Sequence, residues 1–110
     1  MPFSKYHLVQ AAVTASGFAV DEVVCGLAAG ADIFGKKWAY SQTHKIPVKD
    51  FPADWDTHGL KAGPIRNGEM ADYADALIVF IWDNSRGSAN MLKQMQNRNK
   101  PCFVVYNGVI

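Results

Sequence analysis

One stretch decides the fold of this chain: Val24-Cys25-Gly26-Leu27-Ala28-Ala29-Gly30-Ala31-Asp32. An apolar run of strand character ends in a turn of glycine and alanine, and a helical pattern follows at once. Such a turn leaves backbone N–H groups uncovered at the positive end of the helix, where a phosphate can bind without a side chain in its way. The stretch therefore predicts a strand-to-helix turn suited to an anionic ligand.

A second turn of the same kind lies later in the chain. The apolar run of residues 76–81 precedes Trp82-Asp83-Asn84-Ser85-Arg86-Gly87-Ser88, and another helical pattern begins there. Ligands of open α/β sheets bind at the carboxyl ends of the strands, so two such turns meet at one edge. Together they predict one nucleotide-sized pocket.

The length and composition of the chain predict a single domain of modest size. The chain has 110 residues, of which 49% are apolar and 19% charged, enough for one core but not for two domains. A net charge of +1 excludes the basic footprint of a protein that binds duplex nucleic acid. Every apolar run is shorter than the roughly 18 residues of a membrane span, and no signal peptide is recognisable, so we expect a cytoplasmic protein without a membrane partner. Cys25 and Cys102 lie in predicted buried strands, which indicates reduced thiols rather than a disulfide or a metal pair.

Strands alternate with helices along the sequence. Strands are expected at residues 22–25, 47–51, 76–82 and 102–106, and helices at residues 4–15, from Asp32, from Pro64 to 73 and at 87–97. This order predicts a mostly parallel sheet covered on both faces, a Rossmann-like three-layer α/β/α fold. The first helix is capped by Ser4 and ended by Gly17. The buried faces of the first and last helices are expected to hold Leu8, Ala11, Ala12, Ala15, Ser88, Met91, Leu92 and Met95. The cations Lys93, Arg98 and Lys100 complement the dipole of the last helix and receive no binding role.

The connection of residues 52–62 is predicted to have no helix or strand of its own. Structureless connections of about 12 residues are uncommon in compact domains unless they have a function. Asp54, Asp56 and His58 alternate as ligands of a divalent metal do, but so short a match favours a solvated loop, and no metal is expected. Two interpretations of Trp55 stay open: it stacks on a base, or it pins the loop to the core.

Arg66 is the most informative single residue. It shares a helical stripe with Met70, Tyr73 and Ala74, which predicts that it lies on the inward face. Because a guanidinium keeps its charge, it needs an anionic partner there. A ligand phosphate is the partner that we adopt, and the neighbouring Asn67 donates to the same group. The acidic side chains that offer the alternative are Asp32, Glu69 and Asp83.

Four ordered blocks give the chain a resemblance to a known family. They are Gly26-Leu27-Ala28-Ala29-Gly30-Ala31-Asp32, Phe51-Pro52-Ala53-Asp54-Trp55, Ala62-Gly63-Pro64-Ile65-Arg66-Asn67-Gly68-Glu69-Met70 and Trp82-Asp83-Asn84-Ser85-Arg86-Gly87-Ser88. Over roughly residues 3–106 the chain resembles the YspA-like, YpsA-related branch of the SLOG superfamily, which includes the Smf/DprA proteins and the Lonely-Guy phosphoribohydrolases. The resemblance implies one Rossmann-like domain over residues 1–110 that binds nucleotides or nucleotide-derived ligands.

The enzyme chemistry of Lonely-Guy proteins carries over only in part. Arg66-Asn67-Gly68-Glu69-Met70 resembles their Arg-Lys-x-x-Met helix, which implies a phosphate-binding or catalytic role for Arg66. Gly87-Ser88 resembles the end of their Pro-Gly-Gly-x-Gly-Thr turn, but Ala89, Asn90 and Met91 stand where a glutamate is expected. A phosphoribohydrolase is therefore the alternative function, and its catalytic candidates are Arg66, Glu69 and Asp83.

The start of the chain also departs from the family. Its members open with an apolar strand and a Gly-Ser-Arg-type turn, and Phe3-Ser4-Lys5-Tyr6 resembles the residues that come after that turn. The resemblance thus implies that the usual first strand is missing from between the strands at 22–25 and 76–82. A shortened natural form, a missed start site and a rearranged sheet are all open explanations. Two apolar strand edges would be exposed unless they pair with each other or with another chain, so self-association or protein contact is a third hypothesis.

The function that we expect is binding of a phosphate-bearing nucleotide derivative, for sensing or sequestering rather than turnover and with no cofactor. Trp55 or Trp82 would stack on the base. Binding of single-stranded DNA, as in Smf/DprA proteins, is disfavoured because no basic groove is evident. The expected ligand-binding residues are Gly26, Ala29, Gly30, Ala31, Asp32, Asp54, Trp55, Arg66, Asn67, Met70, Trp82, Asp83, Ser85, Gly87 and Ser88.

Overall fold

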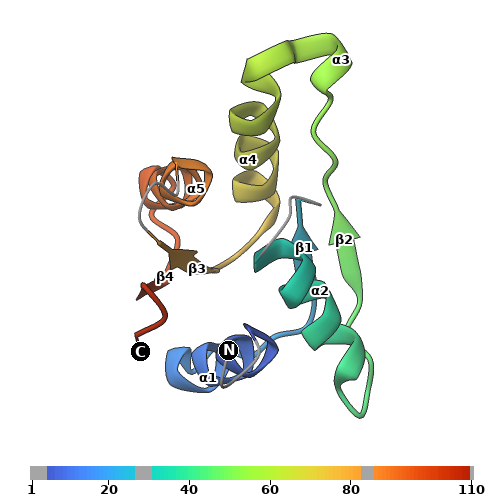
Figure 1. The fold of residues 1–110 in the computed structure, drawn as a ribbon, viewed down its shortest axis with the longest axis vertical. Helices are drawn as coiled ribbons and strands as arrows, with labels where there is room; N and C mark the ends of the chain where they lie inside the picture. The colour runs from blue at the N-terminus through green and yellow to red at the C-terminus, as the bar shows by residue number, and fades with distance from the viewer. Residues whose placement is uncertain (1–4, 27–30, 83–85, 110) are drawn as a thin grey trace.

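The fold is mixed α/β, as the alternation of patterns predicts. The computed structural model describes residues 5–26, 31–82 and 86–109, with the backbone alone for residues 5–6 and 31–34. None of the helices in these ranges is both long and apolar enough to cross a membrane. In chain order the elements are α1 (Lys5–Ser16), β1 (Val23–Cys25), α2 (Ala31–Ser41), β2 (Val48–Asp50), α3 (Trp55–His58), the 3-10 turn η1 (Gly59–Lys61), α4 (Ala62–Tyr73), β3 (Leu77–Ile81), α5 (Arg86–Asn97) and β4 (Cys102–Tyr106) (Figure 1).

The strands form two parallel pairs. In one pair Val23 of β1 lies opposite Val48 of β2. In the other, Leu77 of β3 lies opposite Cys102 of β4, and the register continues for five residues. The prediction of parallel pairing is confirmed within each pair, but no ladder joins β1 to β3 in the described ranges. The two inner edges therefore do not pair with each other.

Local signals explain where the helices end. Gly17 follows α1 with a φ of +72°, the left-handed conformation that glycine adopts without strain. The predicted inward face of α1 is right for Leu8 and Ala12, but Ala11 and Ala15 are exposed. Val9 is buried instead, at 7% exposure. The helix is rotated toward the larger side chain because valine removes more apolar surface from water than alanine does.

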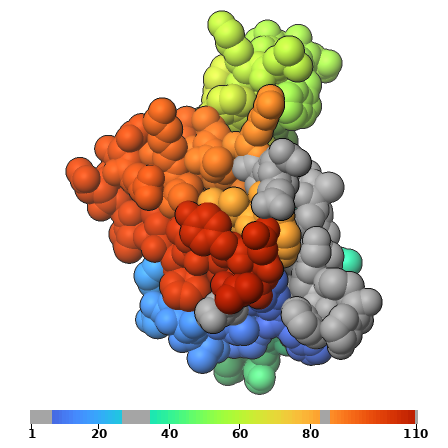
Figure 2. Space-filling model, turned by 60° about the vertical axis from the view of Figure 1, so that its left-hand side comes forward, coloured from blue at the N-terminus to red at the C-terminus, as the bar shows by residue number. Residues whose placement is uncertain are grey.

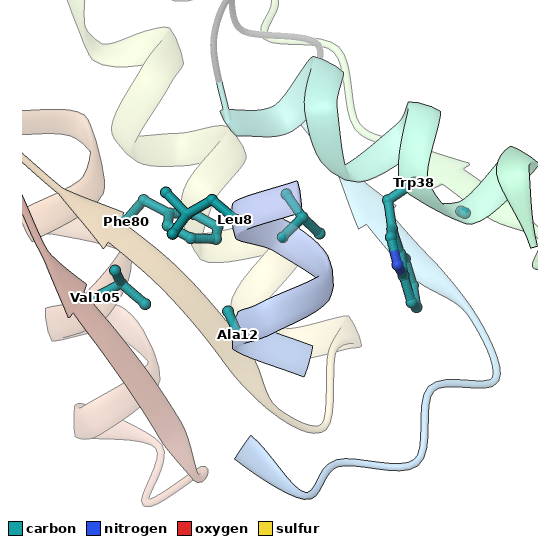
Figure 3. Close-up of a cluster of buried hydrophobic side chains, with 7 residues drawn as sticks. Leu8, Ala12, Trp38, Phe80 and Val105 are labelled. Carbon is teal, nitrogen blue, oxygen red and sulfur yellow. The ribbon is translucent and has the colours of Figure 1, made fainter. Parts of the chain in front are cut away.

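The larger core lies where α1 and α2 pack against β3 and β4 (Figure 3). This cluster brings together Leu8 and Ala12 of α1, Trp38 of α2, Phe80 of β3 and Val105 of β4. The indole Nε1 of Trp38 donates to Oε1 of Gln10 at 2.7 Å, so this buried ring keeps its hydrogen bond.

A second core lies between α4 and α5. Met70 and Ala71 of α4 pack there with Met91 and Met95 of α5. The predicted burial of both α5 methionines is confirmed, while Ser88 and Leu92 are half-buried. Figure 1 shows α1 on one side of β3 and α5 on the other, so the two cores lie on opposite sides of this strand.

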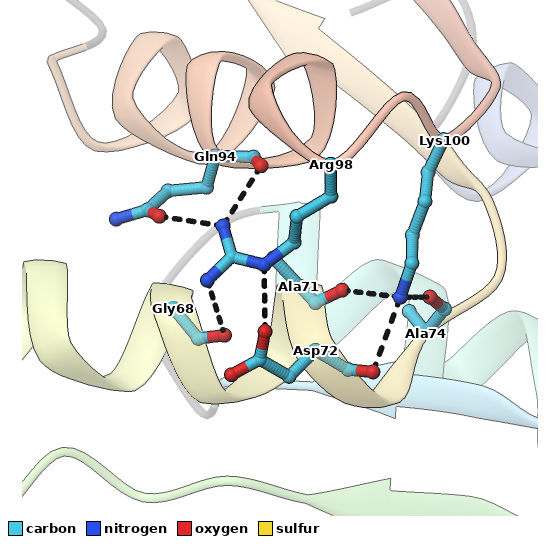
Figure 4. A network of polar contacts seen from close by, with 7 residues as sticks. All are labelled: Gly68, Ala71, Asp72, Ala74, Gln94, Arg98 and Lys100. Atoms are coloured by element: carbon cyan, nitrogen blue, oxygen red, sulfur yellow. Dashed lines mark hydrogen bonds and ion pairs between the residues drawn. The ribbon is translucent and has the colours of Figure 1, made fainter.

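The cations after α5 act mainly on α4. Nζ of Lys100 donates to the carbonyl oxygens of Ala71, Asp72 and Ala74 at 2.7, 3.1 and 2.6 Å (Figure 4). Nε of Arg98 contacts Asp72 Oδ1 at 2.7 Å in an ion pair. Lys100 thus complements the negative end of α4, a neighbouring helix, rather than only its own.

Residues 52–62 do not form the structureless connection that we expected. Asp54 Oδ1 accepts a hydrogen bond from the Thr57 backbone N–H at 3.1 Å and caps α3, which η1 extends into α4. The segment stands out from the body of the molecule (Figure 2). Trp55 is 57% exposed and Leu60 is 94% exposed, so the tryptophan does not pin this segment to either core.

Candidate functional site

Arg66 connects α4 to the end of β1. Its Nη1 donates to the carbonyl oxygen of Gly26, the residue that follows β1, and its Nε donates to Oδ1 of Asn67 at 3.0 Å. The side chain is half-buried. Two hydrogen bonds to groups on different elements hold the guanidinium in one place, at the carboxyl end of a parallel strand.

The absence of a side chain at Gly26 permits this approach. A Cβ atom there would lie 2.7 Å from Arg66 Nη1 and 2.9 Å from Cζ, closer than real Cβ atoms come to a neighbour. Gly26 is itself buried. The described position of the arginine therefore depends on the missing side chain at Gly26, because a Cβ there would make the guanidinium shift.

Asn67 continues the connection to α5. This amide is only 8% exposed. Its Nδ2 donates to the Gly87 carbonyl oxygen at 3.3 Å and to Asn90 Oδ1 at 3.1 Å, while its Oδ1 accepts from Arg66. The hydrogen bonds therefore run from Gly26 through Arg66 and Asn67 to the first turn of α5, so these predicted residues do converge.

Asn90 is the residue that sequence reasoning did not assign to the site. The resemblance to Lonely-Guy enzymes indicates only that their acid is missing near this position. The available signal was its spacing, since Asn90 lies three residues after Gly87 and so belongs to the same turn of α5. The Asn90 amide accepts a hydrogen bond from the Asn67 amide. Because an amide does not exchange protons in the ordinary pH range, Asn90 cannot replace a catalytic acid.

No carboxylate of the described side chains pairs with Arg66. The ion pairs formed by those side chains join Lys36 to Asp50 at 3.3 Å and Arg98 to Asp72 at 2.7 Å. Glu69, one of the alternatives for neutralising Arg66, is exposed and makes no such pair. The other two, Asp83 and the side chain of Asp32, lie outside what the structure describes.

Part of the Arg66 guanidinium has no hydrogen-bond partner among the described residues. Of its nitrogens, Nε and Nη1 bond to Asn67 and Gly26, and Nη2 has no hydrogen-bond partner in the described part of the chain. A planar Nη2 group carries two N–H donors suited to a phosphate or carboxylate.

Other predicted site residues lie elsewhere or outside the description. Ala29, Gly30, Asp83 and Ser85 fall outside the described ranges, and Ala31 and Asp32 are described only as backbone at the start of α2. Met70 packs in the core between α4 and α5. Its stripe neighbour Tyr73 is 45% exposed, so the predicted inward face is wrong for that residue. Ser88 is half-buried in the first turn of α5.

The two tryptophans that were candidates for base stacking differ in position. Trp82 stacks on Phe80 with ring centroids 6.1 Å apart and is half-buried beside the larger core. Trp55 lies on the projecting segment of α3. Its neighbour Asp54 is occupied as a helix cap, and hydrogen bonds from Thr57 lower the pKa of the Asp54 carboxyl. In the ranges that the structure covers, no three His, Cys, Asp or Glu side chains gather as a metal site would require.

A separate hollow lies away from Arg66. A cavity of about 270 Å³ opens between β1 and β3, lined by residues of α1, α2, α4 and α5 as well. Met70 borders it, whereas Arg66 and Asn67 do not. The polar junction and the apolar cavity are thus separate features.

Comparison with known proteins gives a match to a phage protein. The chain is 34% identical over 83 residues to the Gene 61 protein of Mycobacterium phage D29, and the match covers 72% of this chain and 66% of that protein. This share is just under two thirds of the relative's length. No family model and no solved structure matches the chain.

Proposed function

We propose that this chain binds a nucleotide or a nucleotide-derived ligand through its phosphate, at the junction of Gly26, Arg66 and Asn67. The observation that carries the proposal is the tethered guanidinium of Arg66, which has no ion pair among the described side chains. An arginine cannot lose its charge, so a half-buried one without a carboxylate is well suited to an anionic ligand.

The two hydrogen bonds of Arg66 fix the place at which an anion would bind. Gly26 and Asn67 occupy Nη1 and Nε, which leaves the Nη2 edge to donate to phosphate oxygens. Asn67 also binds the Gly87 carbonyl oxygen and so keeps the arginine beside the first turn of α5. The amino terminus of a helix stabilises negative charge through its unpaired N–H groups and its dipole.

A Rossmann-like three-layer arrangement is part of this proposal. It is supported by the two cores, one made with α1 and α2 and the other with α4 and α5, which lie on opposite sides of β3. The parallel pairing within each strand pair supports it too. In such folds ligands bind where the carboxyl ends of the strands meet, and Gly26 lies at such an end.

Binding without turnover is the form of the proposal that the described residues favour. Glu69 is exposed and does not bond to Arg66, and Asn90 supplies an amide rather than a carboxylate. Cleavage of an N-glycosidic bond requires a group that donates a proton or stabilises positive charge at the sugar. Sensing or sequestering requires only the anion site.

The test is isothermal titration calorimetry with AMP, cyclic AMP, ADP-ribose and, as the phosphate-free control, adenosine. We expect at least one phosphate-bearing ligand to bind and adenosine to bind at least about tenfold more weakly. Arg66→Ala should lose about tenfold or more of the affinity, while Lys93→Ala, at an exposed position of α5, should bind like the parent. If Arg66→Ala and the parent bound the phosphate-bearing ligand with equal affinity, Arg66 would not be part of the binding site.

The same ligands also separate binding from turnover. After prolonged incubation with the protein, chromatography should recover each nucleotide intact. Release of free base or ribose 5-phosphate that disappears in Arg66→Ala would overturn the sensing interpretation in favour of a phosphoribohydrolase.

A further inference from the structure

The cavity between β1 and β3 has an apolar interior. Its lining includes the buried side chains of Val9, Trp38, Met70, Phe80 and Met91. The indole N–H of Trp38 already donates to Gln10, so none of these side chains needs a hydrogen bond from a ligand. The interior therefore offers an apolar group contacts with rings, methyl groups and thioethers.

The exposed part of the described lining lies at one edge of the sheet. It belongs to two segments, residues 19–22 before β1 and residues 73–75 before β3, whereas no lining residue inside either strand is exposed. The cavity therefore opens at the amino ends of these strands. Gly26 and Arg66 meet at the opposite end of β1.

Three carboxylates stand at this mouth, those of Asp21, Glu22 and Asp75, and all three side chains are exposed. The hydrogen bond that the Tyr73 hydroxyl donates to Glu22 is the main reason why the pKa of Tyr73 is raised, and the charges of Glu22 and Asp75 add to it. These two carboxylates therefore lie near the same hydroxyl group.

No cation of the described side chains forms an ion pair with these carboxylates. Lys100 contacts the lining residue Ala74, but its Nζ is bonded to three backbone carbonyl oxygens. Lys49 has its Nζ 5.8 Å from the ring centroid of Tyr73 and is not itself part of the lining. The mouth of the cavity thus carries negative charge that attracts a cationic ligand.

The volume of the cavity limits that ligand to a small molecule. A cavity of about 150 Å³ holds benzene, and pockets for drug-sized ligands begin at about 300 Å³. The space between β1 and β3, about 270 Å³, lies between these two sizes. It suits one aromatic ring with a short alkyl chain.

We propose that this cavity binds a small arylalkylamine, with the ring inside and the ammonium group at the carboxylates of Asp21, Glu22 and Asp75. The ring would replace the empty space beside the aromatic and methionine side chains. The ammonium has three N–H donors for the carboxylates and stays in contact with water. This site is separate from the phosphate site proposed above, because Arg66 and Asn67 do not line it.

Three ligands of similar shape separate the effect of charge from that of the apolar body: phenylpropylamine, phenylpropanol and phenylpropanoate, each with its polar group at the end of the chain. At low ionic strength we expect the amine to bind with a Kd below about 1 mM. The alcohol should bind at least about fivefold more weakly and the carboxylate at least about twentyfold more weakly. Amide chemical shifts of the 15N-labelled protein should place the amine at Val23, Val24, Leu77 and Ile78.

Variants of the mouth test the carboxylates. Asp75→Asn should weaken binding of the amine by about threefold, and its combination with Asp21→Asn by about tenfold, while the affinity for the alcohol stays unchanged. Asp56→Asn is the matched control, because it removes the same charge from an exposed position of α3 outside the lining. This control should bind the amine like the parent.

Gly35 of α2 gives access to the interior. It lines the cavity, and a Cβ there meets only Val23 Cγ1 at 4.0 Å, an ordinary contact. Gly35→Leu should fill the cavity and weaken binding of both the amine and the alcohol by about tenfold or more, whereas Gly35→Ala should bind both like the parent. Arg66→Ala should also bind both like the parent, so the phosphate site can fail without changing these results.

The ligand series in the parent protein decides the matter whether or not Gly35→Leu folds. An alcohol or a carboxylate that binds as tightly as the amine would overturn the proposal, and so would shifts that spare β1 and β3. Failure of the parent to bind the amine at about 5 mM would overturn it as well. A folded Gly35→Leu that binds the amine like the parent would place the ligand outside this cavity and have the same consequence.

Discussion

Arg66 donates a hydrogen bond from Nη1 to the carbonyl oxygen of Gly26, forty residues earlier in the chain. This contact joins the middle of α4 to the end of β1 and determines where the guanidinium lies. The glycine contributes by its small size, because a Cβ would overlap the arginine. The turn that begins at Gly26, which the sequence predicts as a ligand site, therefore also binds the side chain of Arg66.

Gly26→Ala should displace Arg66. The added methyl group would lie 2.7 Å from Nη1, at the far end of a flexible side chain, so the guanidinium should move and lose its bond to Gly26. We expect a loss of stability of about 1 kcal/mol or less and weaker binding of phosphate-bearing ligands. Gly63→Ala is the control, because its Cβ meets Trp55 at an ordinary 3.5 Å inside α4. That variant should be neutral or more stable by up to about 1 kcal/mol. Urea unfolding measures both stabilities and calorimetry measures ligand affinity; an unchanged affinity in Gly26→Ala would contradict the displacement of Arg66.

Asn67 and Asn90 should behave as one unit. Asn67→Ala removes a buried amide and takes a partner from the half-buried side chains of Arg66 and Asn90 and from the Gly87 carbonyl oxygen, so we expect a loss of about 1–3 kcal/mol. Asn90→Ala should cost less, because it breaks only one of these bonds. In a double-mutant cycle the combined variant should lose less than the sum of the single losses, by about 0.5 kcal/mol or more. Strict additivity would show that the two amides act independently.

Lys100→Met should destabilise the protein although Lys100 lies in the short connection between α5 and β4. The change removes three hydrogen bonds to the carbonyl oxygens at the end of α4 (Figure 4) and keeps an apolar stem of similar length. We expect a loss of about 1–3 kcal/mol in the free energy of unfolding. Lys93→Met, on the exposed side of α5, should change it by less than about 0.5 kcal/mol. Equal effects would mean that the contacts of Lys100 contribute nothing.

Acid should release the amino terminus of α3. The hydrogen bonds from Thr57 hold the pKa of Asp54 below its ordinary value of 3.8, so the charged form is favoured in the folded state. The stabilisation is therefore complete above that value and is lost as the pH falls through the lower, folded-state pKa. The Thr57 amide signal in an NMR titration should report this loss. Asp54→Asn, which keeps an acceptor oxygen, should hold the cap at every pH, whereas Asp54→Ala should lack it throughout. A Thr57 signal in the parent that does not follow acidification would contradict the assignment.

The elements themselves were largely predictable because their signals are local. The strand at residues 102–106 was predicted with the bounds of β4, and the last helix begins within one residue of its expected start. Gly17 marked the end of α1 through a conformation that few other residues adopt. Alternation of strand and helix also indicated parallel pairing, which both pairs show.

The features that the sequence did not reveal depend on contacts between distant residues. The meeting of Asn67 and Asn90 requires α4 to pack on α5, and no local pattern encodes that packing. The choice of Val9 over Ala11 on α1 likewise depends on what the helix faces. The helix at Trp55–His58 was a different kind of error, because its cap at Asp54 and the acid at Asp56 in its first turn were legible signals.

The separation of the strands into two ladders also bears on how the molecule comes apart. The β1·β2 pair has three matched residues, while β3·β4 has five and is flanked by both cores. No rung joins the two ladders in the described ranges, so side chains alone couple them: Val23 and Val48 pack against the cluster that contains Phe80 and Val105. Because β1·β2 is the shorter ladder, low concentrations of denaturant should expose the segment around β2 to protease cleavage before the β3·β4 ladder opens.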